Sequence, residues 1–402
     1  MRIKNDVPRD VLTMAGVALC VSLGFGIVAP AIPLFATQFG VSATAAGVVV
    51  SSFALMRLIF GLVAGRLADR LGGRTSLIIG LAVVAVSSLL AGVAQDYPQL
   101  LILRGIGGMG SALFGVASMA IVLNAAGKQL RGQAMSIYRM GFLVGGIIGP
   151  AAGGAVLGIS LRAPFFLYGG TLALAGVVGL VFLGRDAEKA TPSDSDEGDA
   201  VPETPAPDRT FGEVLRTREY QAALTTNFAV GLAVFGIRST VLPLLIVEHL
   251  HASPGWVGVA FLVSALVQTA LMFPAGKWSD TAGRRPPLVV GSAIAGAGLL
   301  MLAFAGSLAM ALIAIGLFSA GSAFLGTVPG ALVGDVAGKR SGTVLAVFNM
   351  ASDFGAVIGP VVAGWLVDQG SYTAAFGLGA GVVLLSGVLG MRLRPREAST
   401  IR

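Results

Sequence analysis

The amino-acid sequence predicts an all-α integral membrane protein in which 12 transmembrane helices form two pseudo-symmetric six-helix bundles. Three observations predict this fold class. Only 12% of the 402 residues are charged and 55% are hydrophobic, whereas a soluble domain carries about 25% charged residues. Twelve apolar runs each approach the roughly 20 residues needed to cross a bilayer. A polar ten-residue segment occurs twice, at residues 65–74 and 276–285.

The twelve apolar runs are separated by polar segments, so each is expected to be one spanning helix. The first run is too long for a signal-peptide core and its end matches the seventh run, so we interpret it as a retained span. The single cysteine, Cys20, lies within it, which excludes a disulfide framework. The expected spans are residues 12–35, 45–64, 77–94, 98–124, 134–159, 164–183, 221–245, 255–275, 288–306, 309–333, 343–366 and 373–391.

The repeat extends beyond the polar segment. Gly110-Ser111-Ala112 matches Gly321-Ser322-Ala323 at the same spacing, and Gly149-Pro150 matches Gly359-Pro360 at nearly that spacing. An even number of spans separates the copies, so both halves enter the membrane in the same direction, as in parallel repeats.

The repeat divides the chain into an N-terminal six-helix bundle, residues 1–185, and a C-terminal six-helix bundle, residues 211–402. Residues 186–210 between them are rich in Asp, Glu, Pro, Ser and Thr and have almost no bulky apolar residues. Such a composition cannot bury a core. We therefore predict a disordered cytoplasmic linker, with a functional acidic segment as the alternative. Residues 211–219 are expected to form a short amphipathic helix before the seventh span.

The placement of basic residues predicts the orientation. The net charge of +7 would suit a nucleic-acid partner, but 22 of the 27 Lys and Arg residues fall on one side of the expected spans. Cytoplasmic segments are enriched in Lys and Arg. We therefore expect a multi-pass inner-membrane protein with both termini cytoplasmic and no nucleic-acid partner. The Tyr and Trp residues lie near the expected span ends, which predicts an aromatic belt.

The duplicated polar segment predicts a cytoplasmic gate. A tight turn between antiparallel helices needs unusual dihedral angles, which favours Gly72 and Gly73. Asp69 is the single acid among three arginines, so it can pair locally or meet the N-terminal end of a helix from the other half. Positive-inside charge alone is the alternative, but the second copy repeats the acid. The expected gate residues are Gly65, Asp69, Arg70, Gly72, Arg74, Asp280 and Arg284.

Twelve spans, the parallel repeat and this segment together resemble the major facilitator superfamily, over the whole chain except the termini and the linker. The loop pattern Gly-x-Leu-Ala-Asp-Arg-x-Gly-x-Arg is the most specific element, and residues 65–74 fit it. The second copy departs from the pattern at Trp278 and Thr281, so we expect the N-terminal loop to form the tighter gate. The resemblance implies a secondary transporter that works by alternating access, with residues 1–185 rocking against residues 211–402.

The fifth expected span resembles helix 5 of the family's drug-proton antiporters, with the pattern Gly-x-x-x-Gly-Pro-x-x-Gly-Gly. The first span, which contains Phe25 in Leu23-Gly24-Phe25-Gly26-Ile27, also resembles these exporters. The eleventh span repeats the glycines, so the motif serves either export or close helix packing. The matching residues are Gly145, Gly149, Pro150, Gly153 and Gly154.

Ionisable residues within the expected spans are candidates for coupling, because a charge at membrane depth costs roughly 3 kcal/mol and is functional by default. Arg104 resembles the family's helix 4 arginine associated with proton transfer, although the first span lacks the acid that accompanies it in many relatives. Asp353 is the only carboxylate well inside a span, and contact with water or with an arginine would change its proton affinity. We hypothesise that Asp353 carries the coupling proton; a static Asp–Arg pair is the alternative. The other intramembrane charges are Arg57, Arg139 and Arg238, of which Arg139 is close enough to the cytoplasmic end to snorkel.

The intramembrane charges also suggest a class of substrate. Four arginines to one aspartate leave a positive surplus, which favours anionic or zwitterionic substrates over lipophilic cations. Uncharged polar residues in the spans either line a cavity or join helices. The candidate substrate-binding residues are Arg57, Arg238, Asn227, Gln268, Asn349, Ser352 and Phe25.

The sequence argues against an enzyme. It contains no P-loop, and its two histidines, His249 and His251, form no metal-binding pattern. We therefore expect no catalytic residues, no cofactor and no metal. The leading interpretation is a monomeric exporter of small amphipathic, drug-like compounds driven by proton antiport. The alternatives are a metabolite or sugar-type permease, acting as a symporter or facilitator, and a membrane substrate sensor without flux.

Overall fold

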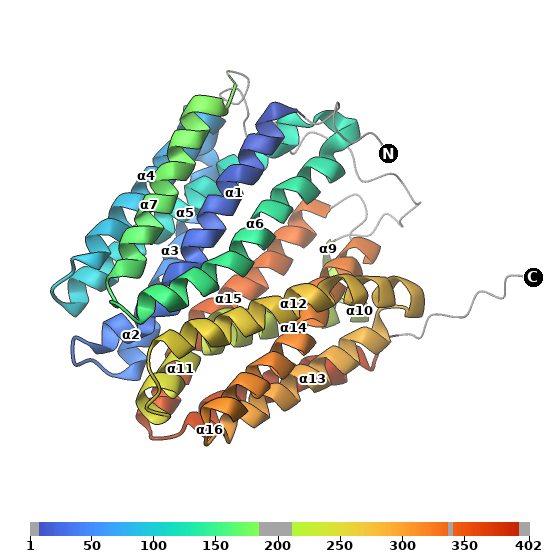
Figure 1. The fold of residues 1–402 in the computed structure, drawn as a ribbon. Coiled ribbons are helices and arrows are strands. Elements are labelled where there is room, and N and C mark those ends of the chain that lie inside the picture. The colour runs from blue at the N-terminus through green and yellow to red at the C-terminus, as the bar shows by residue number, and fades with distance from the viewer. Residues whose placement is uncertain (1–7, 185–210, 337–340, 394–402) are drawn as a thin grey trace, which may run out of the picture. The chain divides into compact units, whose positions relative to one another are not determined.

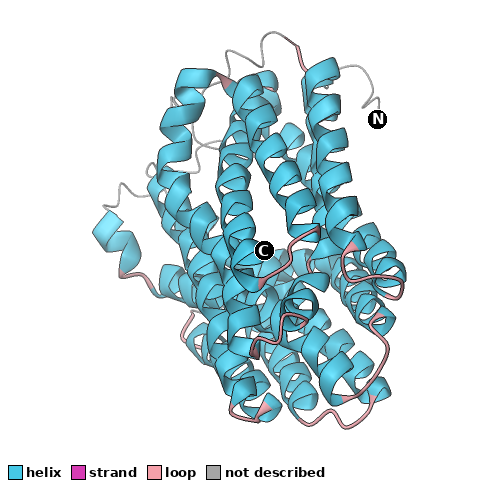
Figure 2. Cartoon of the chain, turned by 90° about the vertical axis from the view of Figure 1, so that its left-hand side faces the viewer, coloured by secondary structure: helices cyan, strands magenta, loops and turns pink. Residues whose placement is uncertain are grey.

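The structure is a computed structural model that describes residues 8–184, 211–336 and 341–393. These residues are almost entirely helical, and no strand occurs in the three ranges (Figure 1; Figure 2). Within them, 12 helical segments are long and apolar enough to cross a membrane. Each overlaps one expected run, which confirms the predicted fold class. The predicted linker, residues 186–210, lies outside the described residues.

Six of the spans lie in the N-terminal part of the chain. The first, Arg9–Thr37, is interrupted at Ala29 and Pro30, because proline lacks the backbone N–H that an unbroken helix needs. Ser42 and Asp96 begin the second and fourth spans as N-caps, each accepting a backbone N–H of the first turn. The helices are α1 (Arg9–Val28), α2 (Ala31–Thr37), α3 (Ala43–Leu71), α4 (Gly73–Gly92), α5 (Tyr97–Ala125), α6 (Gly127–Leu157) and α7 (Ala163–Phe182).

The other six spans lie in the C-terminal part. The seventh, Arg218–His249, is irregular, because two π-helical stretches flank the segment that contains Pro243. Such stretches are rare and frequently occur at functional sites. The short helix expected before this span is present as α9 (Phe211–Leu215). The remaining helices are α10 (Arg218–Val230), η2 (Gly231–Arg238), α11 (Ser239–Leu244), η3 (Leu245–His249), α12 (Gly255–Ala282), α13 (Arg285–Ala303), α14 (Leu308–Val336), α15 (Ser341–Asp368) and α16 (Tyr372–Gly390).

The helices group into two compact units. Unit 1 comprises Met1–Asp199 with Ser253–Leu262, and unit 2 comprises Ala200–Ala252 with Val263–Arg402. In unit 1, α4 packs against α5 and α7, and in unit 2, α13 packs against α14 and α16 (Figure 1). The two units therefore pair corresponding helices of the sequence repeat in the same way.

Gly72 and Gly283 occupy corresponding positions in the two copies of the polar segment. Their φ angles are 81° and 84°, in the region that glycine reaches without steric cost. Gly73, for which an unusual dihedral was also expected, instead begins α4 as a helical residue, so that expectation is wrong. One glycine is enough to reverse the chain, because Gly72 ends α3 and also precedes the first residue of α4.

The aromatic belt is only partly present. Trp365 is 54% exposed, as a residue facing lipid should be, but Tyr168 is only 3% exposed and Tyr220 is fully buried. The Tyr220 hydroxyl donates a hydrogen bond to the carbonyl oxygen of Val344 at 2.8 Å. A tyrosine that finds such a buried acceptor does not need the membrane interface. The belt prediction is therefore wrong for Tyr168 and Tyr220.

Candidate substrate and coupling sites

In unit 1, Arg104 places a guanidinium group in the interior. Arg104 lies on α5 and is 4% exposed. Its guanidinium carbon lies 4.5 Å from the centroid of the Phe53 ring on α3, a distance at which a cation is attracted to the face of an aromatic ring. Among the described residues, its Nε atom has no hydrogen-bond partner. The site therefore keeps a donor in the interior that a ligand can use.

Arg104 is part of a larger cluster in unit 1. The charges of Arg104 and Arg57 both act on the hydroxyl group of Tyr168 on α7. The Tyr168 ring packs edge-on against Phe25 of α1, with centroids 6.5 Å apart. Of the predicted residues, Phe25 therefore contacts this tyrosine, and Arg57 and Arg104 act on it through their charges. Two aromatic rings beside two cations can accommodate an apolar body that carries a negative group.

In unit 2, the predicted residue Arg238 belongs to a polar cluster. Arg238 ends the π-helical stretch η2 and is half-buried. Its terminal nitrogen Nη1 donates to the hydroxyl of Ser264 on α12 at 2.8 Å. The Ser264 oxygen lies 2.6 Å from the hydroxyl oxygen of Ser319 on α14, and both serines are buried. Three helices therefore fix the direction of one guanidinium group.

The two arginine clusters are not copies of each other. In the repeat, Ser264 aligns with Phe53 and Ser319 aligns with Gly108. In unit 1, Arg104 therefore lies over an aromatic ring. In unit 2, Arg238, which lies on a helix that does not correspond to that of Arg104, is instead hydrogen-bonded to a serine hydroxyl. Sequence reasoning missed these partners because single serines and aromatic residues are common in spans. Comparison of the two repeats could have identified the serines, because each serine in the second repeat aligns with a residue that has no polar side chain in the first.

The candidate coupling residue Asp353 lies on α15 and is half-buried. The preceding residue, Ser352, turns its carbonyl oxygen against Gly231 of η2. Asn227 of α10 donates from Nδ2 to the carbonyl oxygen of Phe348 at 2.6 Å, so it joins helices. Asn349 is exposed on α15. Asn227 and Ser352 therefore lie where the seventh span meets α15.

Two other predicted residues lie apart from this contact. Gln268 is half-buried on α12, one turn beyond Ser264, and so lies beside the Arg238 cluster. Arg139 is exposed on α6, as expected for an arginine that snorkels.

The gate candidates form different contacts in the two copies of the polar segment. Asp69 and Arg70 are exposed and Gly65 is half-buried, while Arg74 donates to the carbonyl oxygen of Leu180. These contacts lie within unit 1, so the latch between halves stays a prediction.

The second copy carries an ion-pair network within unit 2. Arg284 lies 2.6 Å from a carboxylate oxygen of Asp280 and 3.0 Å from one of Asp335 on α14. The hydrogen bond to Asp335, followed by the one to Asp280, raises the pKa of Arg284. The charge of Arg284 is therefore balanced by carboxylates of its own unit.

The helix 5 motif forms a helix contact in unit 1. A Cβ atom at Gly145 would lie 2.5 Å from the carbonyl oxygen of Leu19 on α1, and one at Gly149 would lie 2.6 Å from that of Leu23. Gly153 faces the backbone of Ile27 in the same way. The motif glycines therefore let α6 and α1 approach at backbone distance.

Other residues of the motif extend this contact. Pro150 packs against Gly26 of α1, and Gly154 packs against Gly258 at the start of α12, in the segment grouped with unit 1. In unit 2, Gly359 of α15 meets the backbone of Gly236 in η2. The same contact in both repeats supports the packing role of the motif.

The 12 candidate spans of the described residues, in two related units that each contain an intramembrane arginine, define a multi-spanning membrane protein built like a transporter. A sequence profile described as Major Facilitator Superfamily matches residues 14–244 and 223–402. The chain therefore belongs to this family, whose members are transporters rather than enzymes.

Several relatives are similar over part of the chain. Multidrug resistance protein 1 of Bacillus subtilis (strain 168) is 31% identical over 189 residues, which is 47% of this chain and 48% of that protein. Multidrug resistance protein 2 of the same organism is 32% identical over 165 residues, 41% of each chain. Quinolone resistance protein NorA of Staphylococcus aureus (strain Mu50 / ATCC 700699) is 31% identical over 42% of this chain and 44% of that protein. The matches span less than half the length of these relatives.

A solved structure has the same fold. The human organic anion transporter MFSD10 (TETRAN) superposes with a TM-score of 0.64, covering 95% of this chain and 99% of that chain. At 20% sequence identity, this similarity concerns the fold alone.

Proposed function

We propose that this chain exports small amphipathic, drug-like compounds across the inner membrane by proton antiport. The observation that carries the direction of transport is the similarity of nearly half the chain to proteins named for multidrug and quinolone resistance. Alternating access would come from movement of one unit relative to the other, with the two polar segments as cytoplasmic gates. The functional form would be a monomer with both termini cytoplasmic.

Proton coupling is assigned to Asp353 and Arg104. In the described ranges, Asp353 is the carboxylate that lies far from both ends of its span, and an intramembrane carboxylate is functional by default. Arg104 supplies the buried cation of unit 1. Competition between a proton and the cationic group of a zwitterionic substrate for Asp353 would link the two fluxes.

Anionic or zwitterionic amphiphiles are the proposed substrates, because Arg104 and Arg238 each place a cation in one unit. Arg238→Gln should weaken competition by an anionic amphiphile about tenfold, since a hydrogen bond to a charged group contributes roughly 1.5 kcal/mol or more. Competition by a cationic amphiphile of matched size should not weaken. Inhibition of labelled-substrate transport measures both values.

The matched control is Arg139→Gln, which removes the same charge from an exposed position on α6. This variant should leave the anion preference of the protein unchanged. Stronger competition by the cation in the parent protein would contradict the proposed substrate class.

Expression in a host that lacks its own drug exporters tests the direction of transport. The exporter should lower cellular accumulation of a fluorescent substrate and raise tolerance to it. Raised accumulation would instead indicate the permease, and binding by the purified protein without flux would indicate the sensor.

A further inference from the structure

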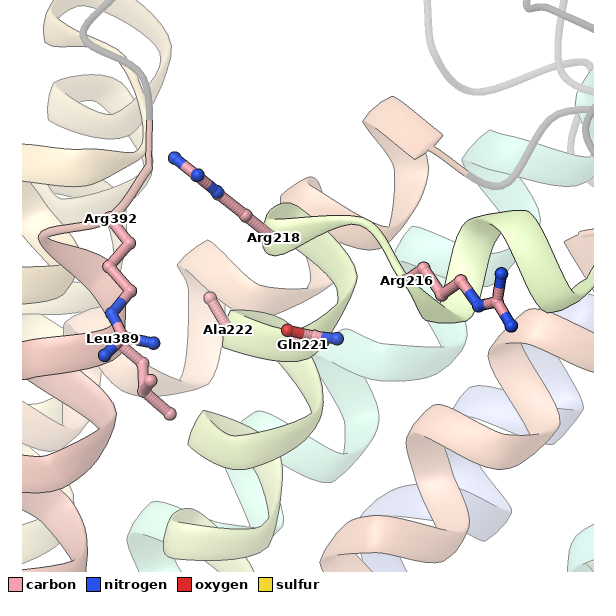
Figure 3. A pocket seen from close by; sticks show the side chains of 6 residues that line it. All are labelled: Arg216, Arg218, Gln221, Ala222, Leu389 and Arg392. Carbon is pink, nitrogen blue, oxygen red and sulfur yellow. The ribbon is translucent and has the colours of Figure 1, made fainter.

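A basic pocket lies in unit 2, where α10 begins and α16 ends. Its volume is about 490 Å³. The seventh span begins at Arg218 and the twelfth ends at Gly390, so the pocket lies at the boundary between bilayer and water. The lining residues are Arg216, Arg218, Gln221, Ala222, Leu389 and Arg392 (Figure 3).

The charges of this pocket are not balanced within the described part of the chain. No carboxylate lines the pocket. Arg216, Arg218 and Arg392 are exposed, and the side chain of none of the three forms a hydrogen bond or an ion pair with another described residue. Their guanidinium groups therefore keep their donors for a ligand. Guanidinium groups bind phosphate by paired, charge-assisted hydrogen bonds.

A neighbouring pocket shows that arginines near the span ends can be accompanied by carboxylates that balance their charge. This second pocket, of about 320 Å³, contains Arg284 and Arg285 but also Glu219 and Asp335. Two acids therefore accompany two arginines there, and Arg284 is paired with Asp335 at 3.0 Å. The basic pocket differs because its arginines have no acid among the lining residues.

Two of the three arginines, Arg218 and Arg392, lie toward the same side of the basic pocket. Figure 3 shows Arg218 directed to the side of the pocket on which Arg392 lies, with the Arg392 side chain running downward beside Leu389, whereas Arg216 points away from both. Gln221, on the first turn of α10, adds an amide that can donate or accept. A phosphate between Arg218 and Arg392 would also lie at the N-terminal end of α10, where the helix dipole favours an anion.

An apolar surface continues from this pocket along α16. Leu389 lines the pocket, and Leu385, one helical turn earlier, is 57% exposed. Val388 and Leu384 of the same helix are 47% and 36% exposed. A free phosphate ion would have no use for such a surface, but an acyl chain would cover it. We propose that this pocket binds the phosphodiester headgroup of an anionic phospholipid, with its acyl chain along α16.

Lipid binding to the purified full chain in detergent tests this proposal without requiring transport. Native mass spectrometry would count retained phosphatidylglycerol and phosphatidylcholine molecules. The double variant R218Q/R392Q should lose apparent affinity for phosphatidylglycerol about thirtyfold, since each basic residue at a membrane surface contributes a factor of roughly five. Its weak binding of phosphatidylcholine should not change. The double variant R218K/R392K should retain most of the phosphatidylglycerol binding.

The matched control is K277Q/R285Q, which removes two charges near span ends outside the basic pocket. The proposal is supported if this control binds phosphatidylglycerol like the parent. Equal loss in both double variants would overturn it, because net charge would then explain the binding. Millimolar inorganic phosphate that displaces phosphatidylglycerol completely would also overturn it, because the pocket would then bind a soluble anion.

Discussion

Replacement of Asp353 by asparagine is expected to reduce pH-gradient-driven transport about a hundredfold or more, the loss typical when a proton-transfer group is removed. Asparagine has nearly the same shape as aspartate but cannot take up and release a proton at this position. Substrate binding should therefore remain measurable while coupled flux disappears. Flux into proteoliposomes with an imposed pH gradient, together with equilibrium binding of labelled substrate, separates the two effects.

The matched control for Asp353→Asn is Asp368→Asn, which changes an exposed carboxylate at the end of the same helix, α15. This control should keep normal coupled transport. If Asp353→Asn also kept coupled transport, Asp353 would have no place in the mechanism. If it lost binding and thermal stability together with flux, the static ion pair would be the better explanation.

Replacement of Gly145 by alanine should destabilise the protein by about 1–3 kcal/mol, the cost of inserting a methylene group into a well-packed contact. The added Cβ atom would lie 2.5 Å from the carbonyl oxygen of Leu19 and 2.7 Å from the backbone nitrogen of Leu23. Backbone atoms cannot move aside as the end of a side chain can, so α6 and α1 would have to separate. The thermal unfolding midpoint in detergent measures this loss.

The neighbouring residue supplies the control for Gly145→Ala. At Gly146, the nearest atom to an added Cβ is the hydroxyl oxygen of Ser22 at 3.5 Å, which is ordinary contact. Gly146→Ala should therefore leave the unfolding midpoint almost unchanged. Equal unfolding midpoints for the two variants would contradict the prediction, because the contact between α1 and α6 would then tolerate a side chain at residue 145.

The fold could be predicted because the features that determine it can be read directly from the order of residues in the sequence. Apolar runs of spanning length and a duplicated polar segment are enough to place 12 helices and to relate their two sets. Arg104 and Arg238 were equally visible, because a charge within an apolar run has few structural explanations. Gly72 was predictable because a tight turn limits which residues can occupy it.

The partners of these residues were not predictable. Phe53 and Ser264 are ordinary residues of spanning helices, and only the contacts with Arg104 and Arg238 distinguish them. The burial of Tyr168 likewise depends on packing between helices distant in sequence. The assignment of Gly73 failed because one residue with positive φ was sufficient for the turn. A sequence therefore identifies residues whose burial in a membrane has a high free-energy cost, such as arginine, better than the ordinary apolar and hydroxyl residues that contact them.

The most direct test of proton antiport is the internal pH of acid-loaded proteoliposomes when substrate is added outside. With the membrane potential clamped at zero, antiport predicts that an anionic or zwitterionic amphiphile enters while the internal pH rises, because protons leave in exchange. The Asp353→Asn variant should show neither change above liposomes without protein. Substrate entry with no change in internal pH, or with a fall in internal pH, would contradict the proposed mechanism.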